Sequence, residues 1–234
     1  TWPPANSRYE PRYFAKNGEL TDTAPQTNAA SDTYEVDFSA SSGINNRWQT
    51  IANFGNPGKE AYDIEYPDRA EQQDKLKTYT TPPLQQALEV TGHPVLTLYL
   101  ASTTSDGAIH VYLEDVGPDG DVVYVTEGLL RLSRRKVSDP PYPTVVPYHS
   151  HFEADSLPLR PGTVAEVKIE LFPTSYLFAA GRSIRVGLAG ADADTFERIP
   201  DDRTVPMLNF FRDSQHPSHL NLPVISIDNQ DLRT

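Results

Sequence analysis

The chain of 234 residues contains no cysteine. This absence excludes disulfides, zinc sites built on thiolates and a cysteine nucleophile, and it leaves the compartment open because reducing and oxidising environments both tolerate such a chain. No apolar run approaches the roughly 18 residues that a membrane-spanning helix needs, and no signal peptide is recognisable. The sequence therefore predicts a chain with neither a transmembrane nor a signal segment.

Positive charge is also scarce. There are 20 Lys and Arg against 32 Asp and Glu, which gives a formal net charge of −12. Such a surface repels phosphate backbones and anionic lipid headgroups, so neither nucleic acid nor a membrane is the expected partner. The acidity is best interpreted as a contribution to solubility. The 21 prolines disfavour long helices.

Apolar residues alternate with polar ones in several short segments, as in strands that place one face on a core. Leucine recurs at every second position of Val95–Leu100, and the segments 109–114, 166–171 and 184–189 repeat the pattern. Only Pro173–Ala180 looks helical, with a proline at its start and Gly181 after its end. Because strands do not alternate with helices, a doubly wound parallel sheet is not expected, and an all-β fold is predicted.

Turn residues separate these strands. Gly117–Gly120 reads Gly-Pro-Asp-Gly, in which proline sets φ for a turn and Asp-Gly supplies the positive φ of a tight hairpin. Asn17 and Gly18 predict a smaller hairpin near the start. Residues 39–75, in contrast, are polar and weakly periodic. So long an irregular stretch is unusual inside a compact domain, and we expect it to lie over the sandwich or against a partner domain.

The sequence offers no catalytic serine. An α/β-hydrolase needs Gly-x-Ser-x-Gly, where a strained strand-to-helix turn exposes the nucleophile, and this pentapeptide does not occur. Ser42 precedes a glycine but lacks the second glycine and the flanking elements. We therefore predict no catalytic residue in this chain.

Two groups of residues could hold a metal ion. His149 and His151 would share one face of a strand, with Asp155 four residues further on, a donor set that suits zinc. Because a third firm ligand is not evident, we prefer a proline-rich loop that runs into an edge strand and exposes both histidines.

The second group is Asp192, Asp194 and Glu197, which carry the oxygen ligands that calcium prefers. Their segment lacks the central glycine of an EF-hand loop, so we expect a solvated loop. The sequence thus predicts no metal site and no cofactor.

Several segments together resemble a known family. The most specific are Leu76–Leu84 (LKTYTTPPL) with Leu88–Pro94 (LEVTGHP), and Leu113–Gly120 (LEDVGPDG) with Thr126–Arg131 (TEGLLR), followed by Leu171–Phe178 (LFPTSYLF) and His219–Val224 (HLNLPV). In these segments the chain resembles the C-terminal, non-catalytic domain of the X-Pro dipeptidyl-peptidase, cocaine esterase and α-amino-acid ester hydrolase family. The resemblance covers essentially the whole chain. Departures at Gly107–Ala108 and Gly181–Ser183 concern loops.

The resemblance implies a jelly-roll β-sandwich of the galactose-binding-like type. It implies one domain over residues 1–234, in which 1–75 form an opening hairpin and a long irregular segment and 76–234 form the sandwich core. In the family this domain packs against an α/β-hydrolase domain of the same polypeptide, which carries the Ser-His-Asp triad. The parent enzymes are peptidases or esterases that cleave amide or ester bonds through an acyl-enzyme intermediate.

Aromatic side chains in the irregular segment are the candidates for contact with that partner. We predict that Trp48, Phe54, Tyr62 and Tyr66 are interface residues, because large aromatic side chains dominate binding energy at interfaces. Exposed sandwich edges also leave a homodimer open.

Two other functions remain as alternatives. The same sandwich class hosts carbohydrate-binding modules, and fold does not fix function. Trp48 with Asn45, Asn46 and Gln49 could supply an aromatic platform and amides for a sugar. The chain could also be a hydrolase with a cryptic site, which turnover of a proline-dipeptide or simple ester chromogen would reveal.

Overall fold

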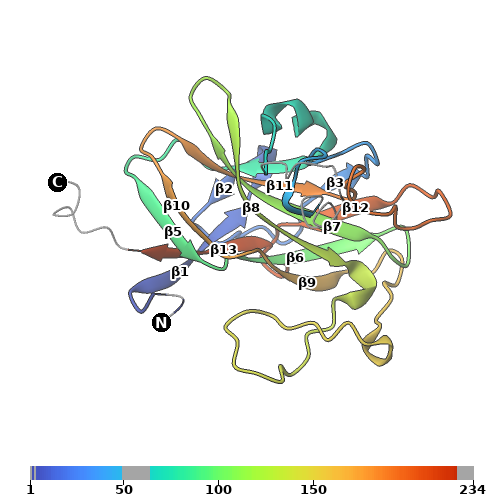
Figure 1. Cartoon of the computed structure of the whole chain (residues 1–234). Helices are drawn as coiled ribbons and strands as arrows, with labels where there is room; N and C mark the ends of the chain where they lie inside the picture. The colour runs from blue at the N-terminus through green and yellow to red at the C-terminus, as the bar shows by residue number, and fades with distance from the viewer. Residues whose placement is uncertain (1, 3, 49–63, 226–234) are drawn as a thin grey trace, which may run out of the picture.

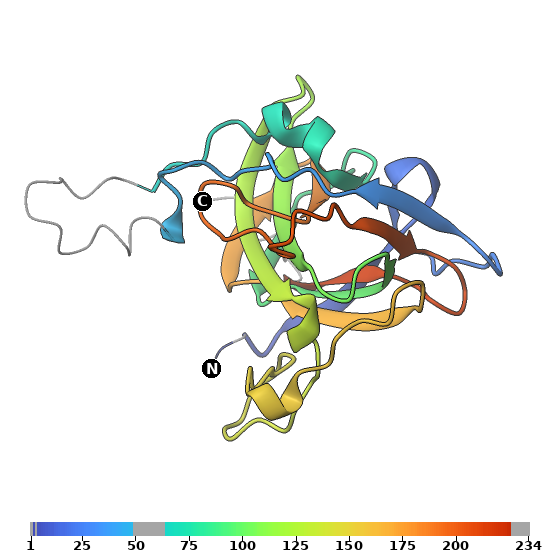
Figure 2. The ribbon, with the colours of Figure 1, turned by 90° about the vertical axis from the view of Figure 1, so that its right-hand side faces the viewer.

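The computed structural model describes residues 2, 4–48 and 64–225. In this part of the chain, strands form two antiparallel sheets that face each other (Figures 1 and 2). The nine-stranded sheet has the order β10-β5-β13-β6-β12-β3, with β1 attached at β13, β2 at β1 and β9 at β6. Its strands are β1 (Ser7–Phe14), β2 (Leu20–Thr21), β3 (Ser31–Glu35), β5 (Leu88–Gly92), β6 (Val95–Ser102), β9 (Ala165–Glu170), β10 (Thr174–Phe178), β12 (Met207–Phe211) and β13 (His219–Ile225).

The smaller sheet has four strands in the order β4-β11-β7-β8. They are β4 (Lys77–Thr80), β7 (Ala108–Val116), β8 (Val122–Arg131) and β11 (Ser183–Ala189). Residues 47–48 are α-helical, and the other described helices are short 3₁₀ turns, namely η1 (Lys16–Gly18), η2 (Arg69–Lys75), η3 (Leu132–Arg134) and η4 (Glu153–Asp155). None of them is long and apolar enough to cross a membrane. The predicted all-β sandwich is confirmed.

The core lies between the two sheets and follows the predicted alternation. Leu96, Leu98 and Leu100 of β6 are completely buried, and Val111 of β7 and Val186 of β11 meet them from the other sheet. Each such side chain contributes about 2 kcal/mol through its burial. The hydrophobic effect therefore fixes which face of each strand points inward.

Both predicted hairpins are present. Between β7 and β8 the N–H of Gly117 donates to the carbonyl of Asp121 at 2.9 Å, and Gly120 adopts a φ of +87°. Near the start, β1 pairs with β2 across Asn17 and Gly18, which have φ of +63° and +73°. A Cβ on Gly18 would lie 2.9 Å from the carbonyl oxygen of Thr78. Glycine is therefore needed for the close approach of this hairpin to β4.

The expected helix over Pro173–Ala180 is wrong. Residues 174–178 form strand β10, which pairs with β5 from Thr174 opposite Gly92 to Phe178 opposite Leu88. Pro173 and Gly181 bound the segment as they would bound a helix, but Gly181, with a φ of +84°, turns the chain from β10 into β11. Because β5 offers an open edge and the core accepts Phe178, tertiary pairing overrides the local signal.

The strands β7 and β11 are buried on both faces rather than on one. His110, Tyr112 and Glu114 of β7 were expected to face solvent, yet all are less than 5% exposed. Tyr112 and Glu114 are covered by the two described parts of the irregular segment, residues 39–48 and 64–75, which we call the covering segment. His110 packs against Phe196. Figure 2 shows both parts, in blue and teal, passing over the side of the molecule formed by β7 and β8. The expected excursion over the sandwich is thus present in the described residues.

Candidate functional site

A buried ion cluster joins the covering segment to the small sheet. The Nε of Arg69, in η2, lies 2.9 Å from Oε1 of Glu114 on β7, and the Nε of Arg185, on β11, lies 2.7 Å from Oε2. The three side chains are at most 3% exposed. One carboxylate thus holds two cations from two other elements through charge-assisted hydrogen bonds.

Further contacts fix Arg69 in place. Its Nη1 donates to the carbonyl of Ser41 at 2.9 Å, and its Cζ lies 4.0 Å from the centre of the Tyr112 ring. Burial disfavours the charge of Arg69, but the carboxylate of Glu114 outweighs this and raises the pKa of Arg69. The residue is therefore a permanent cation that ties the two parts of the covering segment to β7.

A second buried network lies beside this cluster, around Asp192. Its carboxylate accepts hydrogen bonds from the Ser42 hydroxyl and, at 2.9 Å, from the Tyr112 hydroxyl. Asn46 donates to the Ser42 hydroxyl at 2.8 Å. The expected solvated loop is therefore wrong for Asp192, which is 2% exposed, whereas Asp194 and Glu197 are exposed. Hydrogen bonds from Tyr112 and Ser42 hold the Asp192 carboxylate in the buried layer between the covering segment and the small sheet.

His110 lies next to this network and packs against Phe196, with ring centres 5.2 Å apart. Burial lowers the pKa of His110 to about 4, although the charge of Asp192 acts in the opposite direction. The imidazole is therefore neutral at pH 7 and takes part as an apolar ring.

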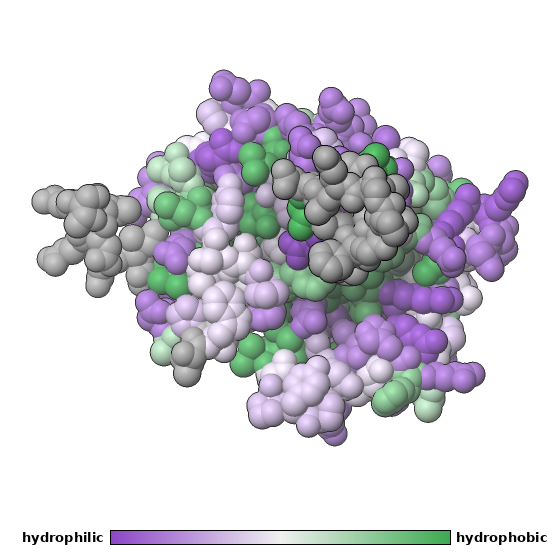
Figure 3. All heavy atoms as spheres, viewed as in Figure 1, coloured by the Kyte–Doolittle hydropathy of each residue, from purple (hydrophilic) through white to green (hydrophobic). Residues whose placement is uncertain are grey.

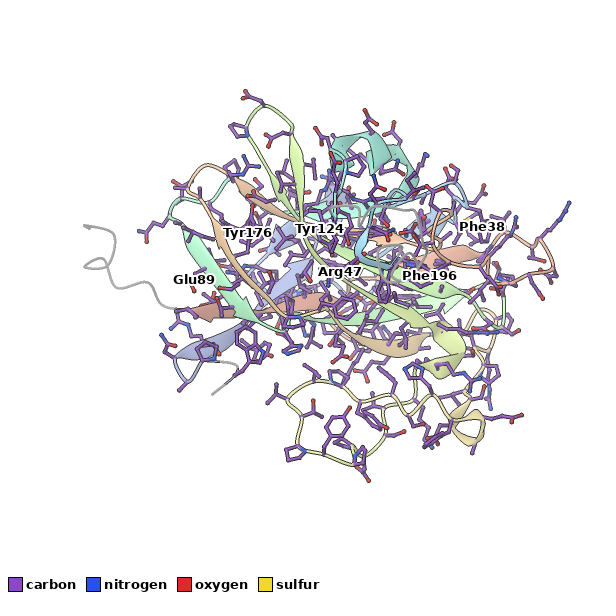
Figure 4. The ribbon with its side chains drawn as sticks, in the orientation of Figure 1. Phe38, Arg47, Glu89, Tyr124, Tyr176 and Phe196 are labelled. Carbon is purple, nitrogen blue, oxygen red and sulfur yellow. The ribbon has the colours of Figure 1, made fainter. Side chains whose placement is uncertain are left out.

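On the outer side of the covering segment lies an aromatic–arginine cluster, which consists of Arg47, Trp48, Tyr66, Tyr124 and Phe172. Tyr66 stacks on Tyr124 with ring centres 3.6 Å apart and an interplanar angle of 3°. The Cζ of Arg47 lies 4.8 Å from the ring centre of Phe172 and 5.8 Å from that of Tyr124. Figure 4 shows Arg47 and Tyr124 together on the face turned toward the viewer.

Trp48 closes one end of this cluster. Its ring centre lies 5.4 Å from that of Phe172 and 5.3 Å from that of Phe196. Glu127 lies beneath the cluster and accepts a hydrogen bond from the Tyr66 hydroxyl at 3.0 Å. Burial raises the pKa of the Glu127 carboxyl.

The surface around the cluster is mixed rather than polar. Ile44 and Ile64 are 66% and 55% exposed, and Phe172 is 36% exposed. Figure 3 shows hydrophobic residues, in green, interspersed among polar ones on the corresponding face. The face therefore has both apolar area and fixed polar groups, as protein interfaces commonly do.

Of the four predicted interface residues, the structure brings Trp48 and Tyr66 into one cluster, while Phe54 and Tyr62 lie outside the described residues. Tyr124 and Phe172 were missed by the sequence analysis, because residues 122–125 read Val-Val-Tyr-Val and show no alternation that would mark an outer face. No sequence signal marks Arg69 as the central cation. Whether these residues form an interface stays a prediction.

The preferred loop is present at the histidine pair, and His151 is exposed as expected, but His149 is not. Residues 149–151 form a loop without a strand, and His149 is half-buried, with its ring nitrogens 3.0 and 2.8 Å from the carbonyl oxygens of Lys136 and Lys168. The ring centres of His149 and His151 are 6.2 Å apart. Within residues 4–48 and 64–225, no three His, Asp or Glu side chains come together in a way that could hold a metal ion.

The residues proposed for a sugar site do not form one surface. Asn46 is completely buried, and its amide also donates to the Gly43 carbonyl at 2.8 Å and to the Thr195 hydroxyl at 2.6 Å. Trp48 packs against two phenylalanines, and Gln49 lies outside the described residues. The amide beside the tryptophan is thus committed to the fold.

Comparison with known proteins gives concordant matches. The model of the X-Pro dipeptidyl-peptidase C-terminal non-catalytic domain matches residues 1–221. A Mycobacterium bovis protein named as a serine esterase is 44% identical over 227 residues, which are 96% of this chain and 35% of the relative. Cocaine esterase from Rhodococcus is 25% identical over 163 residues, 65% of this chain and 26% of that protein. The chain spans about a third of the length of the curated relatives it matches.

Solved structures share the fold. An aminopeptidase from a Thaumarchaeota archaeon has a TM-score of 0.74 at 22% identity and covers 97% of this chain, which corresponds to 38% of the aminopeptidase. An α-amino acid ester hydrolase has a TM-score of 0.72 at 18% identity, with 92% of this chain and 36% of the hydrolase covered. Together with the match over residues 1–221, these findings show that the chain belongs to the family of X-Pro dipeptidyl-peptidase C-terminal non-catalytic domains.

Proposed function

We propose that this chain packs against the α/β-hydrolase catalytic domain of the same polypeptide and forms part of the wall of its active-site cleft. The whole protein would be a serine hydrolase that cleaves ester or amide bonds. This proposal is supported by the family, by the names of the relatives, and by the share of those relatives that the chain spans. About two thirds of the Mycobacterium bovis protein lies outside the match and is available for a catalytic domain.

The observation that carries the docking role is that buried contacts hold the aromatic–arginine cluster in a fixed position. The covering segment is held to the small sheet by Arg69 and Glu114, and its outer side presents Arg47, Trp48 and Tyr66. Trp, Tyr and Arg are the residue types enriched among those that dominate binding energy. Because these contacts already fix the side chains, little conformational entropy remains to be lost on docking.

The described residues support a non-catalytic role as well. Ser42, His110 and Asp192 lie near one another, but the Ser42 hydroxyl donates directly to Asp192 rather than to an imidazole. Ser42 is completely buried and accepts a further hydrogen bond from Asn46. A nucleophile must be reachable by substrate and activated by an adjacent base, and Ser42 meets neither condition.

Limited proteolysis tests the docking role. We expect trypsin to cut after Arg47 more slowly in the intact polypeptide than in the separate chain, because the catalytic domain would cover this bond. Cleavage after Arg203, in an exposed loop, serves as the internal control for protease activity. Equal cleavage after Arg47 in both proteins would exclude docking at this face.

A fluorophosphonate probe tests the assignment of the chemistry. We expect it to label one serine of the intact polypeptide outside this chain, and no serine of the separate chain. Stoichiometric labelling of a serine within residues 1–234 would overturn the non-catalytic role.

A further inference from the structure

Arg47 differs from the other paired arginines in how its charge is neutralised. In the other arginine–carboxylate pairs among the described residues, the N–O distance is 2.7–3.0 Å. Arg47 reaches its nearest carboxylate, Glu127, only at 3.5 Å from Nε to Oε1. We propose that Arg47 receives a carboxylate of the α/β-hydrolase domain of the same polypeptide, so that an interdomain ion pair stands at the centre of the docking surface. This inference rests on the proposed function.

Glu127 is a poor partner for the Arg47 charge. It is 4% exposed and already accepts the hydrogen bond of the Tyr66 hydroxyl at 3.0 Å. Burial raises the pKa of the Glu127 carboxyl, so its negative charge is disfavoured. No second carboxylate pairs with Arg47 among the residues that the structure describes. The four N–H bonds of its two Nη groups therefore have no anionic acceptor there.

The guanidinium is nevertheless held in a fixed orientation. It lies over the Phe172 ring and beside Tyr124, whose ring is itself stacked on Tyr66. An aromatic mount of this kind restricts the long side chain and leaves 32% of it exposed. The loss of side-chain conformational entropy that weakens most surface ion pairs has therefore already occurred on folding.

The chemistry of the site favours a carboxylate as the occupant. A guanidinium presents two parallel N–H donors that match the two oxygens of a carboxylate. Phosphate-rich polyanions are disfavoured by the net charge of −12. A side-chain carboxylate carried on the same polypeptide is delivered at high effective concentration and does not have to approach through this field. The part of the relatives that lies outside the match is long enough to supply a whole domain.

Zero-length cross-linking tests the pair in the intact polypeptide. Arg47→Lys places a primary amine at this position, and a water-soluble carbodiimide joins an amine to a carboxylate only when the two are in contact. We expect mass spectrometry to find position 47 linked to an Asp or Glu of the hydrolase domain. Lys77, which lies over the Tyr79 ring and forms no ion pair within 4.0 Å with a carboxylate of the described residues, reports the background level of linkage. Linkage only to Glu127, or none above that background, would overturn the proposal.

Reassociation separates this proposal from the proposed function. The intact polypeptide is cleaved at a protease site placed between this chain and the rest, and the dissociation constant of the two parts is measured. We expect Arg47→Gln to raise it at least about 30-fold, and to flatten its dependence on salt, because a desolvated charge pair is lost. Arg8→Gln removes the same charge from an exposed pair on β1 and is the matched control.

Each outcome has a distinct meaning. If the wild-type parts associate and Arg47→Gln behaves like Arg8→Gln, the ion pair is refuted and the docking role stands. If folded wild-type parts do not associate, both are refuted. Arg47→Lys keeps the positive charge but loses the paired N–H donors of the guanidinium, so its dissociation constant should lie between those of the wild type and Arg47→Gln. A merely structural role for this arginine would not require this order.

Discussion

Glu114 is the residue whose substitution should be most damaging to the fold. Glu114→Gln keeps the shape of the side chain but removes the negative charge between Arg69 and Arg185, both of which are at most 3% exposed. Removing one partner from a buried ion pair leaves uncompensated charge in a medium of low dielectric, at a cost of about 3–5 kcal/mol. Since typical domains are stable by about 5–15 kcal/mol, this is a large share of the total.

The free energy of unfolding, measured by urea denaturation of the separate chain at pH 7 and 25 °C, checks the value. Glu10→Gln is the matched control, because Glu10 pairs with Arg8 and Arg12 at a partly exposed site and should lose about 1 kcal/mol or less. The combined replacement Arg69→Met, Glu114→Leu and Arg185→Met should cost less than Glu114→Gln alone, because no buried charge is left unpaired. A loss below about 1 kcal/mol for Glu114→Gln would refute the reasoning from buried charge.

Three further effects follow from single sites. Gly18→Ala should lower the free energy of unfolding by about 1–3 kcal/mol, since φ is +73° and a Cβ would press on a backbone carbonyl; thermal denaturation checks this, and an unchanged midpoint would contradict it. Tyr66→Phe should lower the free energy of unfolding by about 1–3 kcal/mol, because buried Glu127 loses its hydroxyl donor. If urea unfolding gives the same free energy for both proteins within error, this hydrogen bond contributes nothing to stability. The pKa of His110 is about 4 in the folded state and near 6.5 in an unfolded chain, so the unfolded state binds the extra proton between these values. Stability should therefore fall by about 3 kcal/mol as pH drops from 7 to 4; His110→Gln should lose less over this range, and parallel pH profiles would contradict the assignment.

The alternating strands could be predicted because each needs only local information. Leu96, Leu98 and Leu100 share one face of any extended chain, and a core on that face follows. The hairpin at Gly117–Gly120 was equally accessible, since the turn residues themselves carry the required φ. The absence of Gly-x-Ser-x-Gly likewise predicted, from the sequence alone, that the chain has no catalytic serine.

The errors came from segments whose state is decided by distant partners. Pro173–Ala180 has the punctuation of a helix, yet it becomes β10 because β5 supplies hydrogen-bond partners more than 80 residues earlier in the chain. Asp192 reads as one carboxylate of a solvated loop, and Ser42, 150 residues away, turns it inward. Alternation also predicted that one face of β7 would be exposed to solvent. This was wrong, because the pattern within a strand carries no information about what packs on its outer face.

Periodicity and short motifs were enough to predict an all-β sandwich and to show that the chain lacks a Gly-x-Ser-x-Gly motif, because both are properties of neighbouring residues. Where charge is buried and which aromatic rings meet could be learned only from the folded structure. Arg69 and Glu114 are ordinary surface residue types until the covering segment excludes water from them, and Arg47 becomes a fixed cation only when Phe172 and Tyr124 come together around it. Desolvation and ring contact depend on what surrounds a residue in space, and this neighbourhood is assembled from strands and loops far apart along the chain.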